Sequence, residues 1–445
     1  SGEPLNNLSS LFFVPRSKVP FHQNVVEEQV RETIGYSIPS RSIILGTLLG
    51  FTGVLAICAA WLSRSGHLEW LGAATPVAAL ISAGILASTG VFYHSAIPSS
   101  TSVIQLVQAV PGTDDVRMTG VAGIYNGGGE TKSEISGQHG GLVTPDMTGL
   151  EGVTRRLIWS DSDRWSWENI TQKLGMRTAL TQTSSSVPVA LAAEASIAAN
   201  GLSGRVVLPE GLQMTDAILA TATGRVALTM GNDGQWTVDQ NSVLLPGQYI
   251  KASFLGDEQQ RRTRIMSEML VPVPNKQVPA VPTVYGWTKA WDTGFSYGQD
   301  APVTGSSLVA IPVSWTSGAP GQECTIPSPV LNYLEVTGPD GGRPSGYFDF
   351  RENKWLEKSG ETSTWIAFDL PREIMPVTLK RAAITLKVKG AMGRLKISGF
   401  KDGQVQPIQT WENPVGTLTY VVEDGSLIPL DANGRFTLRI DAGTS

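Results

Sequence analysis

Three acidic residues lie close together in the stretch SDSDRWSWEN, where their carboxylate oxygens could bind Ca²⁺. They are Asp161, Asp163 and Glu168. A calcium loop of the EF-hand type has Gly at its sixth position and a bidentate Glu at its twelfth. Counted from Asp161, those positions hold Ser166 and Gln172. The pattern therefore favours a solvated loop over a metal site.

Two pairs of carboxylates have the residue types that general acid–base chemistry uses. Asp349 lies near Glu352 in YFDFRENKW, and Asp369 lies near Glu373. Such chemistry needs two carboxyl groups held at a defined separation in a cleft. Nothing in the sequence fixes that separation, so we expect both pairs on surface loops.

Patterns for nucleophilic or phosphate chemistry are weak. The sequence has no G-x-S-x-G motif, and its glycine cluster, residues 126–129, is not followed by Gly-Lys-Ser or Gly-Lys-Thr. Cys58 lies inside an apolar segment, and Cys324 is expected to be a small buried or loop residue. The histidines are far apart in the sequence, at His22, His67, His94 and His139. We therefore expect no catalytic residue, no metal and no cofactor, and a protein that is not an enzyme.

The tryptophans are better suited to contact a ligand or a partner. An exposed indole can stack on a sugar or anchor a protein interface, whereas Trp in an apolar strand belongs to a core. We assign Trp365, in TWIAF, to a core. Trp287 and Trp291 lie in a predicted loop that also carries charges. The predicted interaction residues are Trp287, Trp291 and Trp355.

The composition narrows the classes of protein. The 445 residues include 34 basic and 39 acidic side chains, and a net charge of -5 argues against nucleic acid as the main partner. Charged residues make up only 16%, and 48 Gly with 27 Pro indicate turn-rich β structure. Two cysteines are too few for a disulfide framework or a four-ligand zinc site.

Two long uncharged segments predict a transmembrane helical hairpin. They run from Ile43 to Leu62 and from Leu71 to Tyr93, and each can cross about 30 Å of hydrocarbon. The residues between them, Ser63 to Trp70, suffice for a tight turn. Buried helices of a soluble core are the alternative. Small residues should let the two helices pack closely, and those assigned to hairpin packing are Gly46, Gly50, Gly53 and Gly84.

An even number of spans places both chain ends on one side of the membrane. The count of basic residues flanking the spans decides the side only weakly. Arg31 and Arg41 lie before the first span, and Arg64 lies in the turn. The long β-rich region that follows is typical of extracytoplasmic modules. We therefore expect the ends outside the cytoplasm.

Short runs with period-two alternation lie on both sides of a charged, proline-rich stretch. The expected fold is mainly β with a transmembrane α-helical hairpin and two β-sandwich domains, the second of jelly-roll type. The expected divisions are an N-terminal segment with a short amphipathic helix, taken as the end of a missing domain, 1–42; the hairpin, 43–94; the first sandwich, 95–256; a charged helix and Pro-rich linker, 257–283; and the second sandwich, 284–445.

The order of these features resembles that of a known family. After the hairpin come SVIQLVQAVPG, GLSGRVVLPEGLQMTDAILA, LLPGQY, a charged helix and VYGWTKAWDTG. This order is similar to that of a poorly characterised bacterial family in which a two-helix hairpin anchors extracytoplasmic β-sandwich modules. The stretch STWIAFDLPREIMPV is similar to galactose-binding-like jelly rolls. The resemblance implies a place in the bacterial cytoplasmic membrane and brings no catalytic signature.

Three functions remain open at this point. The first is a membrane-anchored extracytoplasmic scaffold or binding protein, with the lipid bilayer, protein partners and carbohydrate as its partners. The second is an accessory subunit of a membrane transport or secretion complex. The third is a subunit of an enzyme whose catalytic domain is absent from this chain.

Overall fold

A computed structural model describes the chain from residue 21 to residue 443. Side chains within α3, α4, β17 and β18 are described only in part. The gaps between the described residues are 35–40, 67–69, 96–97, 139, 150–153, 161–163, 200, 240–241, 246, 271–278, 280, 299–302, 317–320, 344, 346–347, 350–353, 356–361 and 391–392.

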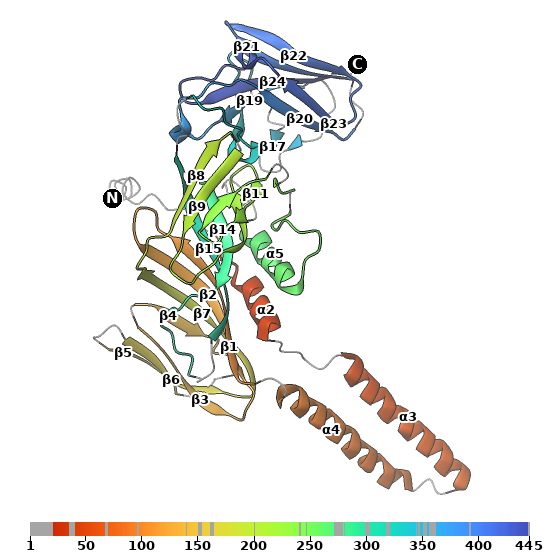
Figure 1. Cartoon of the computed structure of the whole chain (residues 1–445). Helices are drawn as coiled ribbons and strands as arrows, with labels where there is room; N and C mark the ends of the chain where they lie inside the picture. The colour runs from red at the N-terminus through yellow and green to blue at the C-terminus, as the bar shows by residue number, and fades with distance from the viewer. Residues whose placement is uncertain are drawn as a thin grey trace, which may run out of the picture.

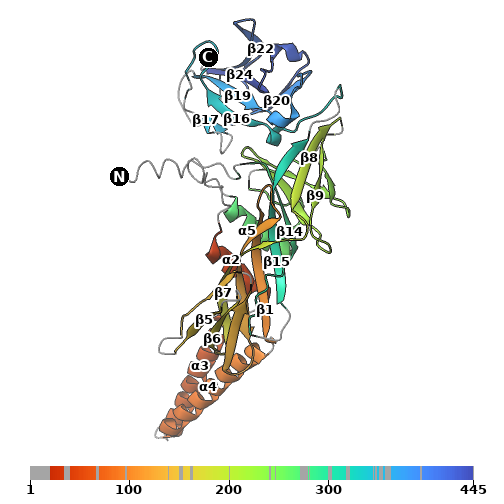
Figure 2. The ribbon, with the colours of Figure 1, turned by 90° about the vertical axis from the view of Figure 1, so that its left-hand side faces the viewer.

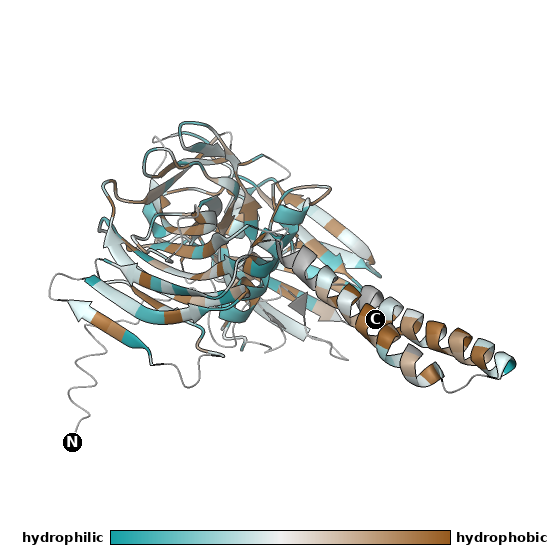
Figure 3. Cartoon of the chain, turned by 90° about the horizontal axis from the view of Figure 1, so that it is seen from below, coloured by the Kyte–Doolittle hydropathy of each residue, from teal (hydrophilic) through white to brown (hydrophobic). Residues whose placement is uncertain are grey.

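The molecule is elongated and mainly β, with a helical hairpin at one end and the C-terminal strands at the other (Figures 1 and 2). The hairpin helices are α3 (Arg41–Ser65) and α4 (Leu71–Ser95), which lie close to the two predicted segments. Both are long and apolar enough to cross a membrane, and no other part of the structure buries them. Figure 3 shows the two helices, with many residues coloured as hydrophobic, extending away from the β region.

A large sheet of twelve described strands forms the centre of the molecule. Its main path runs β12-β13-β9-β8-β15-β1-β2-β7-β4, and β14 joins β15 to β10 and β11. The bounds are β1 Ser100–Ala109, β2 Asp115–Asn126, β4 Leu142–Pro145, β7 Gly175–Ser186, β8 Ala192–Ala198, β9 Gly201–Val207, β10 Thr215–Ala220, β11 Arg225–Ala227, β12 Thr229–Met230, β13 Gln235–Thr237, β14 Thr283–Lys289 and β15 Val303–Thr316.

The strand pairing crosses the predicted boundary at residue 283. Strand β15, from the predicted second domain, pairs in parallel with β1 from the first, in the register Thr101↔Val303 to Gln108↔Ala310. Strand β14 pairs with β15 on one side and with β10 on the other. The chain from 284 to 316 therefore belongs to the central sheet, and a division at that point would cut the sheet.

Helices cover one face of the central sheet. Helix α2 (Gln23–Ile34) packs on β1 and β2, and α5 (Asp257–Met269) lies beside it. The buried apolar residues between helices and sheet come from both helices and from six strands, β1, β2, β10, β11, β14 and β15. Strand β1 is buried on both faces because its alternate side chains meet this layer and the layer opposite.

A small sheet with the order β3-β6-β5 packs on the other face of the central sheet near the hairpin end. Its strands are β3 (Thr131–Gly137), β5 (Arg156–Ser160) and β6 (Arg164–Gln172). Ile135 and Trp165 from this sheet share a core with Val103 and Ala122 of the central sheet.

The C-terminal strands form a five-stranded sheet, β16-β19-β24-β21-β22, and two separate strand pairs. This region is attached to the central sheet by a shared core that includes Val330, Leu370 and Ile374. Trp365 is only 2% exposed in β19, which confirms its assignment to a core. The bounds are η2 Ser328–Val330, β16 Asn332–Val336, β17 Phe348–Asp349, β18 Lys354–Trp355, β19 Thr362–Asp369, η3 Arg372–Ile374, β20 Ala382–Val388, β21 Arg394–Lys401, β22 Gln404–Glu412, β23 Gly416–Val422, η4 Gly425–Leu427 and β24 Arg435–Gly443.

Candidate functional site

The two ends of the hairpin lead into neighbouring parts of the same sheet. Helix α2 precedes α3 in the chain and packs against β1 and β2, while β1 itself follows α4. The Oγ of Ser99, just before β1, accepts a hydrogen bond of 3.1 Å from the N–H of Gly127 in the β2–β3 turn. The candidate site is therefore the region where the apolar hairpin is attached to the central sheet, through α2 at one end and β1 at the other.

The seat of α2 on the sheet depends on one glycine. Val26 and Val30 of α2 are fully buried against the strands. A Cβ on Gly123 of β2 would lie only 2.4 Å from Cγ1 of Val30 and 2.9 Å from Cδ1 of Ile34. The helix can approach the sheet this closely because position 123 lacks a side chain.

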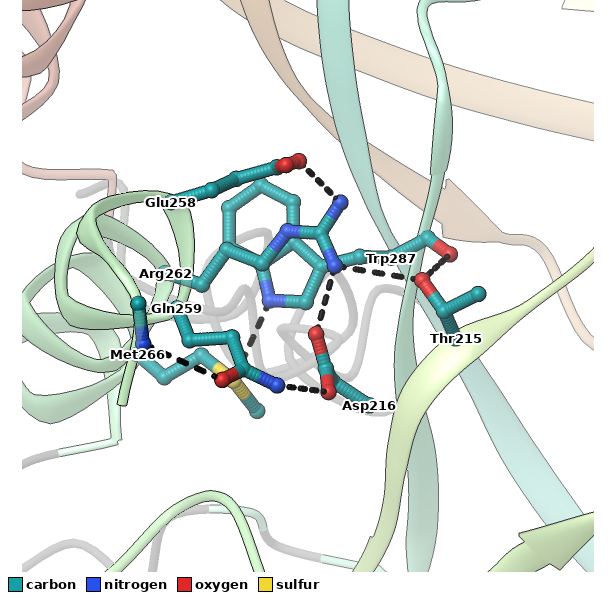
Figure 4. A network of polar contacts seen from close by, with 8 residues as sticks. Thr215, Asp216, Glu258, Gln259, Arg262, Met266 and Trp287 are labelled. Atoms are coloured by element: carbon teal, nitrogen blue, oxygen red, sulfur yellow. Dashed lines mark hydrogen bonds and ion pairs between the residues drawn. The ribbon is translucent and has the colours of Figure 1, made fainter. Parts of the chain in front are cut away.

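The second helix of this layer is held by a polar network around Arg262 (Figure 4). The Arg262 guanidinium pairs with the carboxylates of Asp216 and Glu258, and it donates a 3.2 Å hydrogen bond to Thr215. It also lies over the indole of Trp287, 5.5 Å from the ring centroid. Since Arg262 and Asp216 are each only 15% exposed, this is a half-sequestered ion pair that ties α5 to β10 and β14.

The predicted exposure of two tryptophans is wrong. Trp287 lies in strand β14 and is 0% exposed, because its ring fills the layer between the sheet and α5. Trp291 is 8% exposed, and the amide of Gln105 binds its main chain through two hydrogen bonds of 3.1 Å. Both residues are core anchors rather than contact residues. The side chain of Trp355 lies outside the described residues.

The predicted close packing of the hairpin at its glycines is also not observed. Among the described residues, no atom lies within 4 Å of the place where a Cβ would stand on Gly46, Gly50, Gly53 or Gly84. Gly46 and Gly50 instead line an apolar groove of 1240 Å³ between α3 and α4. These glycines therefore leave open surface on the hairpin.

Among the described residues, the candidate groups for metal or acid–base chemistry are not gathered into a centre. Asp161, Asp163, His139 and Glu352 lie outside the described residues. Of the rest, Glu168 pairs with Arg156 at 2.7 Å and Asp369 pairs with Arg435 at 2.6 Å. Within the described part of the chain, no three His, Cys, Asp or Glu side chains form a metal-binding group.

A polar cavity of 450 Å³ lies between the start of α2 and strands β4 and β7. Glu27 on its wall accepts hydrogen bonds from Thr178 at 2.8 Å and from Arg31 at 3.0 Å. The backbone and side chain of Thr148 donate to Asp146 and lower the pKa of that carboxyl. These acids are engaged by neighbouring donors, and the hydrogen bond from Thr178 to Glu27 connects α2 to β7.

One exposed feature escaped the sequence analysis. All five described residues of strand β5 are exposed. They include Leu157, Ile158 and Trp159, at 42%, 39% and 54% exposure. Three consecutive large apolar residues are the signal, because a strand with one buried face normally alternates apolar and polar side chains.

Comparisons with known proteins leave the family open. No protein-family model matches the chain, and no curated protein matches it significantly.

Proposed function

We propose that this chain is a membrane-anchored scaffold or binding protein whose β modules lie outside the cytoplasm of a bacterial cell. The α3–α4 hairpin inserts into the cytoplasmic membrane. The β modules, which we infer to be sandwiches with the second of jelly-roll type, present surfaces to protein partners or to envelope glycans.

The observation that carries this proposal is the double attachment of the hairpin. Its first helix follows α2, which is seated on β1 and β2, and its second helix leads into β1. The hairpin surface is apolar and uncovered, with Leu80 at 74% and Ile57 at 72% exposure. Such a surface is stable in hydrocarbon and costly in water, so it supports a bilayer as its solvent.

A single charge in the hairpin tests membrane insertion. Leu80→Arg should weaken insertion, because an Arg near the middle of a span costs about 3 kcal/mol. The matched control is Leu245→Arg, at a site of similar exposure (71%) in the β region. We expect carbonate-resistant membrane association for the parent and the control and a large soluble fraction for Leu80→Arg. Equal extraction of all three chains would contradict insertion.

The open glycine surface favours a second candidate, an accessory subunit of a transport or secretion complex. Gly46, Gly50 and Gly53 have free space where a Cβ would stand, so a helix of another protein could approach there. Replacing all three by Leu should then reduce recovery of that partner from detergent extracts, with Ala79→Leu, at an exposed position of α4 outside the groove, as control. Unchanged recovery would remove this candidate.

Carbohydrate binding by the C-terminal module is the narrower form of the first proposal. It is tested by adding immobilised envelope polysaccharides to the full chain in lipid nanodiscs. Retention above the level of empty nanodiscs supports it, and equal retention rejects it.

A further inference from the structure

Two turns at the hairpin end of the central sheet are locked together. They are the β2–β3 turn, which begins at Asn126, and the β6–β7 turn, which runs from Gln172 to Gly175. The Asn126 side chain donates to the carbonyl of Gln172 at 3.2 Å, and the Gln172 side chain donates to the carbonyl of Ile124 at 2.7 Å. Both side chains are buried, at 3% and 2% exposure. The two turns therefore form one rigid unit, the basal corner.

The basal corner lies close to the point where the chain leaves the hairpin. Helix α4 ends at Ser95, and the Oγ of Ser99 accepts the hydrogen bond from Gly127 in the β2–β3 turn. Figure 1 shows α4 beside the ends of β1 and β3. The four residue steps from 95 to 99 span at most about 14 Å. Since the headgroup layer is about 5–8 Å thick on each side of a bilayer, an inserted hairpin brings the corner to the membrane surface.

The tip of the basal corner has an apolar and a basic side chain. Leu174, between β6 and β7, is 46% exposed, and Lys173 beside it is exposed as well. The β2–β3 turn next to them contains three glycines, residues 127–129, which have no side chain to hold the tip away from a flat surface. Leucine at the boundary of the acyl chains, with a lysine that extends to the phosphates, is typical of interfacial contacts. Because Glu130 in the same turn is exposed, the apolar contact contributes more than charge.

We propose that the basal corner is a second membrane contact, in which Leu174 enters the headgroup layer of a phospholipid bilayer and Lys173 reaches the lipid phosphates. A single exposed leucine is ordinary on a protein surface, but this one is continuous with an apolar hairpin that ends a few residues away. The inference rests on the proposed insertion of the hairpin. One anchor leaves the sheet free to tilt, whereas a second contact fixes the direction in which the β modules extend from the membrane.

Fluorescent labels on single cysteines test the contact in the full chain, in nanodiscs of phosphatidylethanolamine and phosphatidylglycerol. The background is Cys58→Ser with Cys324→Ser, and Leu174→Cys carries an environment-sensitive label. Val189→Cys is the matched control, because Val189 is 43% exposed and follows the opposite end of β7, about 40 Å away. A nitroxide on the lipid headgroups should quench the label at 174 and leave the emission at 189 unchanged. Equal quenching at the two positions overturns the proposal.

A third label separates failure of this contact from failure of the hairpin. Leu80→Cys on α4 should be quenched by a nitroxide on the acyl chains when the hairpin is inserted. Quenching at 80 without quenching at 174 overturns the second contact and leaves insertion standing. No quenching at 80 overturns insertion and, with it, the inference. A label at 174 that is unquenched in nanodiscs but shielded from iodide in native membranes overturns the lipid contact in favour of a protein partner.

A charge at the tip tests whether the contact fixes the tilt of the sheet. Leu174→Asp should shift the balance from docked towards tilted orientations about fivefold or more, because a carboxylate replaces an apolar side chain among lipid phosphates. Time-resolved energy transfer from a label on the exposed Cys324, in a Cys58→Ser chain, to a headgroup acceptor reports the height of the C-terminal module. We expect a broader height distribution for Leu174→Asp and the parent distribution for the control, Val189→Asp. An unchanged distribution in Leu174→Asp overturns the positioning role, and if that variant is unfolded the quenching pair still decides.

Discussion

Gln105 is a buried polar side chain that joins two strands far apart in the sequence. Its amide donates to the carbonyl of Trp291 and accepts from the N–H of the same residue, both at 3.1 Å, and it also accepts from Ser307 at 2.7 Å. It is 2% exposed. Removing it takes the amide donor away from the Trp291 carbonyl in a dry environment, while the N–H of Trp291 keeps Ser307 as an acceptor at 3.2 Å.

We therefore expect Gln105→Leu to lower the free energy of unfolding by about 1–3 kcal/mol. Gln108→Leu, on the same strand at a half-buried position, should change it by less than about 0.5 kcal/mol. Denaturant unfolding in detergent measures both. Similar values for the two variants would mean that the amide clamp contributes nothing.

Arg262 and Arg264 are close neighbours on α5 in different surroundings. Arg262 is 15% exposed and pairs with Asp216, which is equally sequestered, whereas Arg264 is 51% exposed and lies 3.6 Å from Glu32. Arg262→Leu should destabilise the fold by about 3–5 kcal/mol, because it leaves the Asp216 carboxylate half-buried without its counter-charge. Arg264→Leu should cost less than about 1 kcal/mol. Equal losses in denaturant unfolding would contradict the role of the network.

Buried tyrosines predict the response of the protein to high pH. Burial raises the pKa of Tyr333 to about 12, and burial also raises the pKa of Tyr285 and Tyr297. Since the folded-state pKa is raised, this stabilisation is complete below the unfolded value of about 10 and is lost as pH rises towards the folded value.

Tyr333→Phe should therefore flatten the loss of stability between about pH 10 and pH 12. Tyr420→Phe, at a half-buried position, is the control. It should keep the steep loss of stability with pH that the parent shows. Thermal unfolding across this range, with tyrosinate absorbance as a second readout, checks the expectation. Identical profiles for the parent and Tyr333→Phe would contradict it.

The tryptophans show what residue types alone could not predict. Trp365 lies in the apolar run TWIAF, and its burial followed from its neighbours in the sequence. The burial of Trp291 depends on Gln105, which is 186 residues away. The burial of Trp287 depends on α5, which is separated from it in the sequence by the proline-rich stretch. No local pattern contains those partners, so an indole flanked by charges was interpreted as exposed.

At the scale of elements, the seat of α2 is the connection between hairpin and sheet. Gly123→Ala should lower the free energy of unfolding by about 1–3 kcal/mol, because the new Cβ would clash with the side chain of Val30. Gly129→Ala, where nothing lies within 4 Å of the new Cβ, should be close to neutral. Thermal unfolding of both variants is the measurement. A neutral Gly123→Ala would mean that the helix adjusts freely and is not seated by this glycine.

The elements themselves were predictable where their patterns were long and regular. The hairpin, the short helix before it and the charged helix after residue 257 were predicted, and they are present as α3 with α4, α2 and α5. Strand pairing was not predictable. The parallel pair β1 and β15 brings together segments about two hundred residues apart, and neither sequence carries a mark of its partner. The apparent boundary at the proline-rich stretch was therefore misleading.

At the scale of the molecule, the C-terminal module is fixed to the central sheet. Thr223 donates to the carbonyls of Pro329 at 3.1 Å and Leu331 at 2.7 Å, and Thr221 donates to Pro329 as well. Together with the shared core at Val330, these contacts should hold the module at one orientation. In the proposed membrane-anchored scaffold, a fixed orientation would hold the far surface of the module at a set distance from the membrane.

Removing both hydroxyls should loosen that orientation. In a cysteine-free background, spin labels at positions 205 and 410 report the distance between β9 and β22. We expect Thr221→Val with Thr223→Val to broaden the distance distribution, and Thr417→Val on the exposed face of β23 to leave it unchanged. An unchanged distribution in the double variant would mean that the apolar core alone fixes the module.

The central claim is that the hairpin anchors the chain with its β modules outside the cytoplasm. The native Cys324 is exposed and serves as the probe for the outside, once Cys58 is replaced by Ser. A second chain carries Cys324→Ser and Ser65→Cys, at the hairpin turn. On intact cells, a membrane-impermeant thiol reagent should label Cys324 and spare residue 65 until the cells are opened. Labelling of residue 65 with Cys324 protected would contradict the account and place the modules in the cytoplasm.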